Sequence, residues 1–273
     1  MTIVAIFKDR IMNKIWTFCF AVIFVLITIP LSAADEDNYL QDYLLSYPKT
    51  IYSAVTAPGS WQKDDWLKAS AVVITGGCLY FLDDNLRNYY QVNRNEFTDG
   101  IFTGAKYFGE VKIIFPVMAV TALGGYLTND EKTIDTSLLC WKSSLISLGV
   151  TQAIKLSTQR QKPYKEEGKE FWQENGISFS RNSFPSGHTT LAWSLAPVLA
   201  EQYKKTKWVP PTVYTIAVLT SLSRLNDDQH WTSDVFAGAV IGYVTAKLVL
   251  KDTPRLMLKV TPEINGVSLM YNF

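Results

Sequence analysis

The chain has 273 residues, of which 48% are hydrophobic and 19% charged, and its formal net charge at pH 7 is +1. This composition is sufficient for a large apolar core and excludes a wholly disordered chain. The near-neutral charge argues against a strongly basic nucleic-acid binder, so we expect no nucleic acid among its partners.

Residues 1–34 have the pattern of a secretory signal peptide. Basic residues up to Lys14 precede the apolar run Ile15–Ile29, and Ser32–Ala34 offers small residues for cleavage. An uncleaved anchor helix is the alternative, because residues 15–34 carry no charge. In either case we expect the rest of the chain to be exported to the periplasm or cell envelope of a bacterium. Two cysteines follow the leader, Cys78 and Cys140, and free thiols in apolar surroundings are the simplest interpretation.

The remaining chain divides into a lead-in segment (35–65), a helical domain (66–252) and a tail (253–273). The domain contains six apolar segments of helical length: Trp66–Leu82, Ala105–Leu127, Thr136–Ser157, Thr189–Tyr203, Pro211–Ser223 and Ser233–Leu250. These segments predict an all-α fold, a helical bundle of about six core helices. In the tail, β-prone stretches on either side of Asn265-Gly266 predict a short hairpin-like structure.

The predicted helices are poor candidates for membrane spans. Their uncharged apolar runs are shorter than the roughly 20 residues that a span needs. If all six crossed a membrane, Lys204, Lys205 and Lys207 would lie outside the cell, against the positive-inside rule. We therefore expect an exported bundle that is soluble or contacts the membrane surface.

Three short segments contain groups suited to catalysis: Lys155–Pro163, Phe184–His188 and Ser223–Asp234. His230 and Asp234 are four residues apart, so on a helix they share one face. A carboxylate bound to the Nδ1–H group of the imidazole would leave Nε2 free as a nucleophile. A solvated surface pair is the alternative reading of these two residues.

The second segment combines a helix start with the other histidine of the chain. Ser186 and Gly187 precede His188 where a helix is expected to begin, and a helix N-terminus favours an anion. An ordinary helix cap would have the same residues. Cationic donors that could bind a phosphoryl group are Lys155, Lys162 and Arg224. An up-and-down bundle would bring these cations and both histidines to one end.

Together the three segments resemble the signature of the type-2 phosphatidic acid phosphatase and vanadium haloperoxidase superfamily. That signature is a Lys, six residues and Arg-Pro; then Pro-Ser-Gly-His; then Ser-Arg, five residues, His, three residues and Asp. The chain matches it except that Lys162 occupies the position of the family arginine. Since lysine cannot form the bidentate fork of arginine, we expect weaker phosphate binding, with Arg160 as a partial substitute.

The resemblance implies a metal-independent phosphatase, without a cofactor, that hydrolyses phosphomonoesters or diphosphates through a phosphohistidine. It implies that His230 is the nucleophile, His188 the acid and base, and Asp234 the group that orients His230. The residues implied to bind phosphate are Lys155, Lys162, Ser186, Gly187 and Arg224. The implied partner is a phosphorylated lipid or small phosphoester at a membrane surface, with vanadate as an inhibitor. Alternatives are a broad-specificity soluble acid phosphatase, a vanadate-dependent haloperoxidase with His230 as vanadate ligand, and a non-enzymatic bundle.

Two further features have more than one interpretation. Tyr164–Asn182 separates the first two segments, and it is either a substrate-selecting lid or a solvated insertion. The paired acids Asp83-Asp84 and Asp227-Asp228 lack the spacing of a metal site, so we expect them to cap helices or to face solvent.

Overall fold

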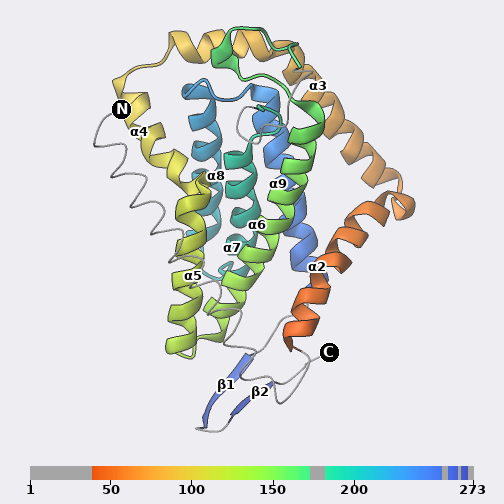
Figure 1. The fold of residues 1–273 in the computed structure, drawn as a ribbon, viewed down its shortest axis with the longest axis vertical. Coiled ribbons are helices and arrows are strands. Elements are labelled where there is room, and N and C mark those ends of the chain that lie inside the picture. The colour runs from red at the N-terminus through yellow and green to blue at the C-terminus, as the bar shows by residue number, and fades with distance from the viewer. Residues whose placement is uncertain (1–38, 173–181, 254–257, 264–265, 270–273) are drawn as a thin grey trace.

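The computed structural model describes residues 39–172, 182–253, 258–263 and 266–269 (Figure 1). The predicted signal peptide, residues 1–34, lies outside this part of the chain. The helices are α2 (Tyr39–Thr56), α3 (Lys63–Val92), α4 (Glu96–Ala105), α5 (Val111–Leu127), α6 (Glu131–Thr158), α7 (Gly187–Gln202), α8 (Val209–Asn226) and α9 (Thr232–Asp252). Short 3-10 helices are η1 (Ala57–Ser60), η2 (Lys106–Gly109) and η3 (Pro163–Lys165).

The predicted helical bundle is confirmed. The six predicted core helices correspond to α3 and α5–α9, and α7 packs against α6, α8 and α9 (Figure 1). The buried core includes Leu191, Val198 and Val249, which are inaccessible to solvent. Outside the bundle, β1 (Leu258–Glu263) and β2 (Gly266–Leu269) pair antiparallel. The other residues of the predicted hairpin-like tail lie outside the described part.

Two helices were not among the six predicted ones. The lead-in segment contains α2. This helix was not predicted because Pro48, a helix breaker by propensity, lies inside it. Tertiary contact stabilises this helix, since the Tyr43 hydroxyl donates to the Leu138 carbonyl of α6 at 3.0 Å. The other helix, α4, begins at a capping box in which Asn95 and Thr98 bond reciprocally.

One helix of the described residues, α9, is long and apolar enough to cross a membrane. A second span is possible only if α4–η2 and α5, which are bent by 57°, are counted as one. The most apolar window of α9 is 44% buried inside the protein. Such burial is also typical of a core helix in a soluble bundle.

Helices α7 and α9 approach closely through glycines. A Cβ added at Gly242 would lie 2.4 Å from the Thr190 carbonyl oxygen, whereas one added at Gly149 of α6 would meet no described atom within 4 Å. We expect Gly242→Ala to lower the free energy of unfolding by about 1–3 kcal/mol, because the helices must separate. Gly149→Ala is the matched control and should be neutral or stabilising by up to about 1 kcal/mol. Equal changes in the two variants, measured by thermal unfolding, would contradict this account of the interface.

Candidate active site

Four helix ends bring the three motif segments together at one end of the bundle. Lys155 and Arg224 lie in the last turns of α6 and α8, and His188 lies in the first turn of α7. His230 lies two residues before α9, next to its N-cap residue Trp231. Backbone hydrogen bonds join the segments, since Ser186 N–H donates to the Asp234 carbonyl at 3.0 Å. The juxtaposition predicted for an up-and-down bundle is therefore present.

The His230 imidazole is fixed through Nδ1. This atom lies 2.8 Å from the backbone carbonyl oxygen of Ser183 and 3.8 Å from Oδ2 of Asp234. Because a carbonyl only accepts hydrogen bonds, Nδ1 carries the proton and Nε2 retains its lone pair. The expected direct bond from Nδ1 to the Asp234 carboxylate is thus wrong, since the carbonyl is the closer acceptor. Burial lowers the pKa of His230 to about 3, so its imidazole is neutral at physiological pH.

Asp234 acts on His230 partly through Ser183. The Ser183 hydroxyl donates to Oδ2 of Asp234 and also lies 3.4 Å from Nδ1 of His230. The Trp231 backbone N–H donates to the same carboxylate oxygen at 2.9 Å, and Arg160 donates to Oδ1 at 2.7 Å. Burial acts to raise the pKa of Asp234, but the neighbouring His230 imidazole, the Arg160 charge and the Ser183 hydroxyl outweigh it and lower the pKa overall. A buried carboxylate is therefore kept ionised beside the imidazole.

Arg160 is fully buried and does not substitute for an arginine at position 162. Its guanidinium binds Asp234, Ser233 (2.8 Å) and Asp83 (2.8 Å). These bonds direct its charge into the protein, toward the start of α9. The expectation that Arg160 compensates for Lys162 in phosphate binding is therefore wrong.

Asp83 was expected to cap a helix or face solvent, and it caps a helix other than its own. It lies in α3, is fully buried, and accepts from the Ser233 backbone N–H at 2.9 Å in the first turn of α9. The other paired acids also have partners: Asp84 binds Lys169 at 3.0 Å, and Arg87 and Arg224 bind Asp228 and Asp227. Apart from the pair Arg224–Asp227, which are three residues apart, these contacts join distant parts of the chain, so residue spacing gave no signal for them.

The three predicted phosphate-binding cations lie near one another. Lys155 donates to the Asn182 carbonyl at 2.6 Å, and Lys162 donates to Gln229 at 3.2 Å. Burial lowers the pKa of Lys155 to about 8, and the charge of Lys162 contributes. Burial also lowers the pKa of Lys162, with a contribution from the Arg224 charge. An anion bound among these groups would relieve their mutual repulsion.

Ser186 and Gly187 form the start of α7. Ser186 is fully buried, and its hydroxyl accepts from Thr189 at 3.0 Å rather than capping the helix. A Cβ added at Gly187 would meet no atom within 4 Å in the described part, so this backbone borders open space. Gly187 therefore leaves room for an anion to approach the backbone at the start of α7.

His188 has a partner that the three segments did not reveal. Its Nε2 lies 3.0 Å from Oε2 of Glu110, which directly precedes α5. Glu110 is 78 residues upstream of His188 and belongs to none of the quoted motifs. Only the three-dimensional contact identifies it as part of the site.

The segment proposed as a lid is described in part, because residues 173–181 lie outside the described residues. Lys169 contacts α3, donating to the Phe81 carbonyl at 3.0 Å. The Gln161 N–H donates to the Phe171 carbonyl at 3.0 Å. The described portion is therefore attached to the bundle, and a lid function stays a prediction.

Cysteines and metal ligands add little to this site. Cys78 and Cys140 are free thiols, one exposed and one buried. Among the residues placed by the structure, no group of three or more His, Cys, Asp or Glu side chains could hold a metal ion.

Comparison with known proteins identifies the domain. Residues 138–258, which include all three segments, match the model of the PAP2 superfamily. The fold agrees with the crystal structure of a transmembrane PAP2 type phosphatidylglycerolphosphate phosphatase from Bacillus subtilis, with a TM-score of 0.50, 20% identity, and coverage of 67% of this chain and 94% of that one. The match over residues 138–258 confirms the predicted resemblance to type-2 phosphatidic acid phosphatases.

Two curated relatives have phosphatase names. The chain is 27% identical over 213 residues to a lipid A 1-phosphatase of Porphyromonas gingivalis, covering 73% of this chain and 43% of that protein. It is also 27% identical over 183 residues to a probable diacylglycerol pyrophosphate phosphatase of Schizosaccharomyces pombe, covering 54% of this chain and 63% of that protein. The chain thus spans less than two thirds of the length of each relative.

Proposed function

We propose that this protein is a metal-independent phosphatase that hydrolyses phosphomonoesters or diphosphates of lipids through a phosphohistidine on His230. The observation that carries the proposal is the buried, neutral His230 imidazole, whose Nδ1–H is held by the Ser183 carbonyl. Its Nε2 is therefore an unprotonated nucleophile. The cations near it and the start of α7 supply an environment for the oxygens of a phosphoryl group.

In this mechanism Nε2 of His230 attacks phosphorus in line, and the bond to the leaving alkoxide breaks. His188 protonates the alkoxide and then takes a proton from the water that hydrolyses the phosphohistidine. Asp234 stabilises the positive charge that forms on His230 during the attack. The phosphoryl oxygens are bound by Lys155, Lys162, Ser186, Gly187 and Arg224.

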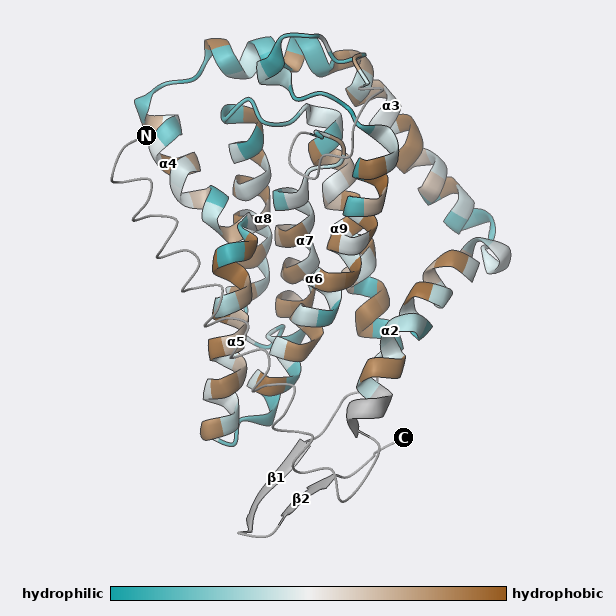
Figure 2. Cartoon of the chain, in the orientation of Figure 1, coloured by the Kyte–Doolittle hydropathy of each residue, from teal (hydrophilic) through white to brown (hydrophobic). Residues whose placement is uncertain are grey.

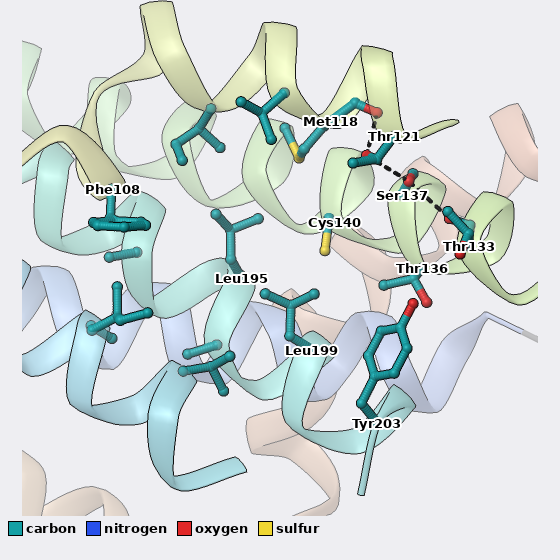
Figure 3. Close-up of a pocket in the computed structure, with 17 residues that line it drawn as sticks. Phe108, Met118, Thr121, Thr133, Thr136, Ser137, Cys140, Leu195, Leu199 and Tyr203 are labelled. Carbon is teal, nitrogen blue, oxygen red and sulfur yellow. Dashed lines mark hydrogen bonds between the residues drawn. The ribbon is translucent and has the colours of Figure 1, made fainter. Parts of the chain in front are cut away.

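An apolar cavity inside the bundle supports a lipid substrate. It has a volume of about 290 Å³ and lies between α5, α6, α7 and α8, where Figure 3 shows Leu195 and Leu199 among the residues that line it. Its lining extends from Phe108, two residues before Glu110, to Tyr203 at the opposite end of α7, and it includes none of the candidate site residues. Such a cavity suits an acyl chain better than the alcohol of a water-soluble ester.

Exposed apolar side chains support contact with a membrane surface. Phe81 of α3 is 75% exposed and Leu127 of α5 is 71% exposed, and Figure 2 shows hydrophobic residues along both helices. Large exposed apolar areas are typical of interaction surfaces.

We also propose that the protein is exported to the cell envelope. N-terminal sequencing of the mature chain would test export, and carbonate washing of membranes would test how the protein is attached to them.

A panel of substrates tests the proposed activity. The purified protein should release inorganic phosphate from lipid phosphates in the presence of a chelator, faster than from water-soluble esters, and vanadate should inhibit it. Faster turnover of soluble esters would favour the broad-specificity acid phosphatase. Peroxide-dependent halide oxidation that requires vanadate, without phosphate release, would replace the proposal with a haloperoxidase. The absence of any turnover would favour the alternative that the protein is a non-enzymatic helical bundle.

Lys162→Arg is expected to strengthen binding of the phosphoryl group. Arginine offers a bidentate fork where lysine offers a point charge, and Lys162 has only the neutral Gln229 side chain as its hydrogen-bond partner in the described structure. We expect Kd for vanadate to fall roughly 3- to 10-fold, the effect of about one additional charge-assisted hydrogen bond. Lys165→Arg, on a nearby exposed lysine, is the control. An unchanged or higher Kd in Lys162→Arg would contradict the expectation.

A further inference from the structure

The contact between Glu110 and His188 determines which nitrogen of His188 carries a proton. The hydrogen bond with His188 lowers the pKa of Glu110, and the charges of Lys112 and Arg224 contribute, so Glu110 is a carboxylate at neutral pH. A carboxylate only accepts hydrogen bonds, which means that the proton in the 3.0 Å contact belongs to Nε2 of His188.

Backbone packing fixes this contact. Gly109 precedes Glu110, and a Cβ added there would lie 2.7 Å from the His188 carbonyl oxygen and 2.8 Å from the His188 Cβ. The junction of η2 and α5 is thus packed directly on the first turn of α7. Glu110 itself begins α5, where its backbone carbonyl accepts from Ile113 and Ile114, both at 2.9 Å. Its position relative to His188 is therefore set by two packed elements.

We propose that Glu110 is a positioning residue that holds Nε2–H of His188 and so makes Nδ1 the nitrogen that exchanges protons in the reaction. This inference rests on the proposed phosphatase function. The two histidines would then work through opposite nitrogens, because Nδ1 of His230 is the one held by the protein.

The proton balance is consistent with this assignment. Nδ1–H of the His188 imidazolium gives its proton to the leaving alkoxide as the bond to phosphorus breaks, and His188 becomes neutral with its proton on Nε2. The Nδ1 lone pair then takes a proton from water as the water oxygen attacks the phosphohistidine. Glu110 remains a carboxylate throughout and stabilises the imidazolium form.

Two substrates that differ in their leaving group test this role. Against an alkyl phosphate lipid, we expect Glu110→Gln and Glu110→Ala to lower kcat/KM by about 10- to 10²-fold, a part of what acid catalysis contributes. Against p-nitrophenyl phosphate, whose leaving group needs no proton, the loss in kcat/KM should be at most a few-fold, because kcat/KM reports the steps up to departure of the leaving group and not the later attack of water.

Glu96→Gln, which changes an exposed carboxylate of α4, is the matched control and should alter kcat/KM for neither substrate. Equal losses of kcat/KM on both substrates would overturn the proposal, because they indicate a structural effect. A rise in kcat/KM would also overturn it, since Glu110 would then act only by repelling phosphate.

Nitrogen-15 NMR of the imidazoles tests the same claim without turnover. Neutral His188 should be the Nε2–H tautomer in the unmodified chain and should lose this preference in Glu110→Ala. An Nδ1–H tautomer in the unmodified chain would overturn the proposal even if the protein is an active phosphatase. Conversely, failure to release phosphate from any ester would refute the proposed function while leaving the tautomer measurable.

Discussion

Replacing His230 by alanine is expected to lower kcat for phosphate release by at least about 10⁴-fold, because the reaction loses its nucleophile. The Lys155, Lys162 and Arg224 cations remain in this variant, so vanadate should still bind. The measurement is phosphate release from a lipid phosphate at saturating substrate, together with vanadate binding by calorimetry.

Ser183→Ala is the matched control for this prediction. It removes the hydroxyl that donates to Asp234 but keeps the backbone carbonyl that holds Nδ1 of His230. We expect it to lower kcat by only about 10-fold, since one hydrogen bond of the charged network is lost. If His230→Ala kept more activity than Ser183→Ala, His230 would not be the nucleophile.

Removal of the Arg160 side chain should cause a large loss of stability. Arg160→Ala leaves Asp83 and Asp234 buried without their shared cation, and breaking a buried ion pair typically costs about 3–5 kcal/mol. Arg94→Ala is the control, because Arg94 and Asp99 form an exposed pair, each side chain 39% exposed. The control should lose less than about 1 kcal/mol. Thermal unfolding of both variants checks the difference, and equal losses would contradict the buried network.

The loss of stability in Arg160→Ala should depend on pH, and the loss should be larger at high pH than at low pH. Burial already raises the pKa of Asp83 in the unmodified chain, and the pKa should rise further without the guanidinium. The pKa of Asp234, which is lowered in the unmodified chain, should then also rise above that of the unfolded chain. Groups with a raised folded pKa favour the folded state at low pH and lose this contribution as the pH rises. The difference in stability from the unmodified chain should therefore be smaller near pH 5 than near pH 8. A difference that grows toward low pH would contradict this explanation.

Local sequence patterns predicted the bundle well. Apolar segments of helical length identified the six predicted helices, and α5–α9 pack against one another as expected. The first of them, α3, is not a core helix, because Asp83 is its only buried residue among those described. The prediction missed α2 because Pro48 is a helix breaker by propensity, whereas packing against α6 sustains the helix. Boundaries also differed: α3 continues to Val92, ten residues beyond the predicted end at Leu82, through a stretch that is largely polar.

The site could be predicted only as far as its motifs extend. His188, His230, Asp234 and the cations lie in short segments with fixed spacing, and the structure brings these segments together. Their partners do not follow from spacing. Asp83 is 77 residues from Arg160, and Glu110 is 78 residues from His188. The preference of Nδ1 for the Ser183 carbonyl over Asp234 also depends on how the loop before α7 is folded.

The central claim is that His230 becomes phosphorylated during turnover. Rapid mixing with a lipid phosphate, followed by an alkaline quench that preserves phosphohistidine and by peptide mass spectrometry, measures this directly. The account predicts phosphate on the peptide that contains His230, formed before phosphate release and absent from His230→Ala. Phosphate on His188 instead, or steady turnover with no phosphorylated histidine at any mixing time, would contradict it.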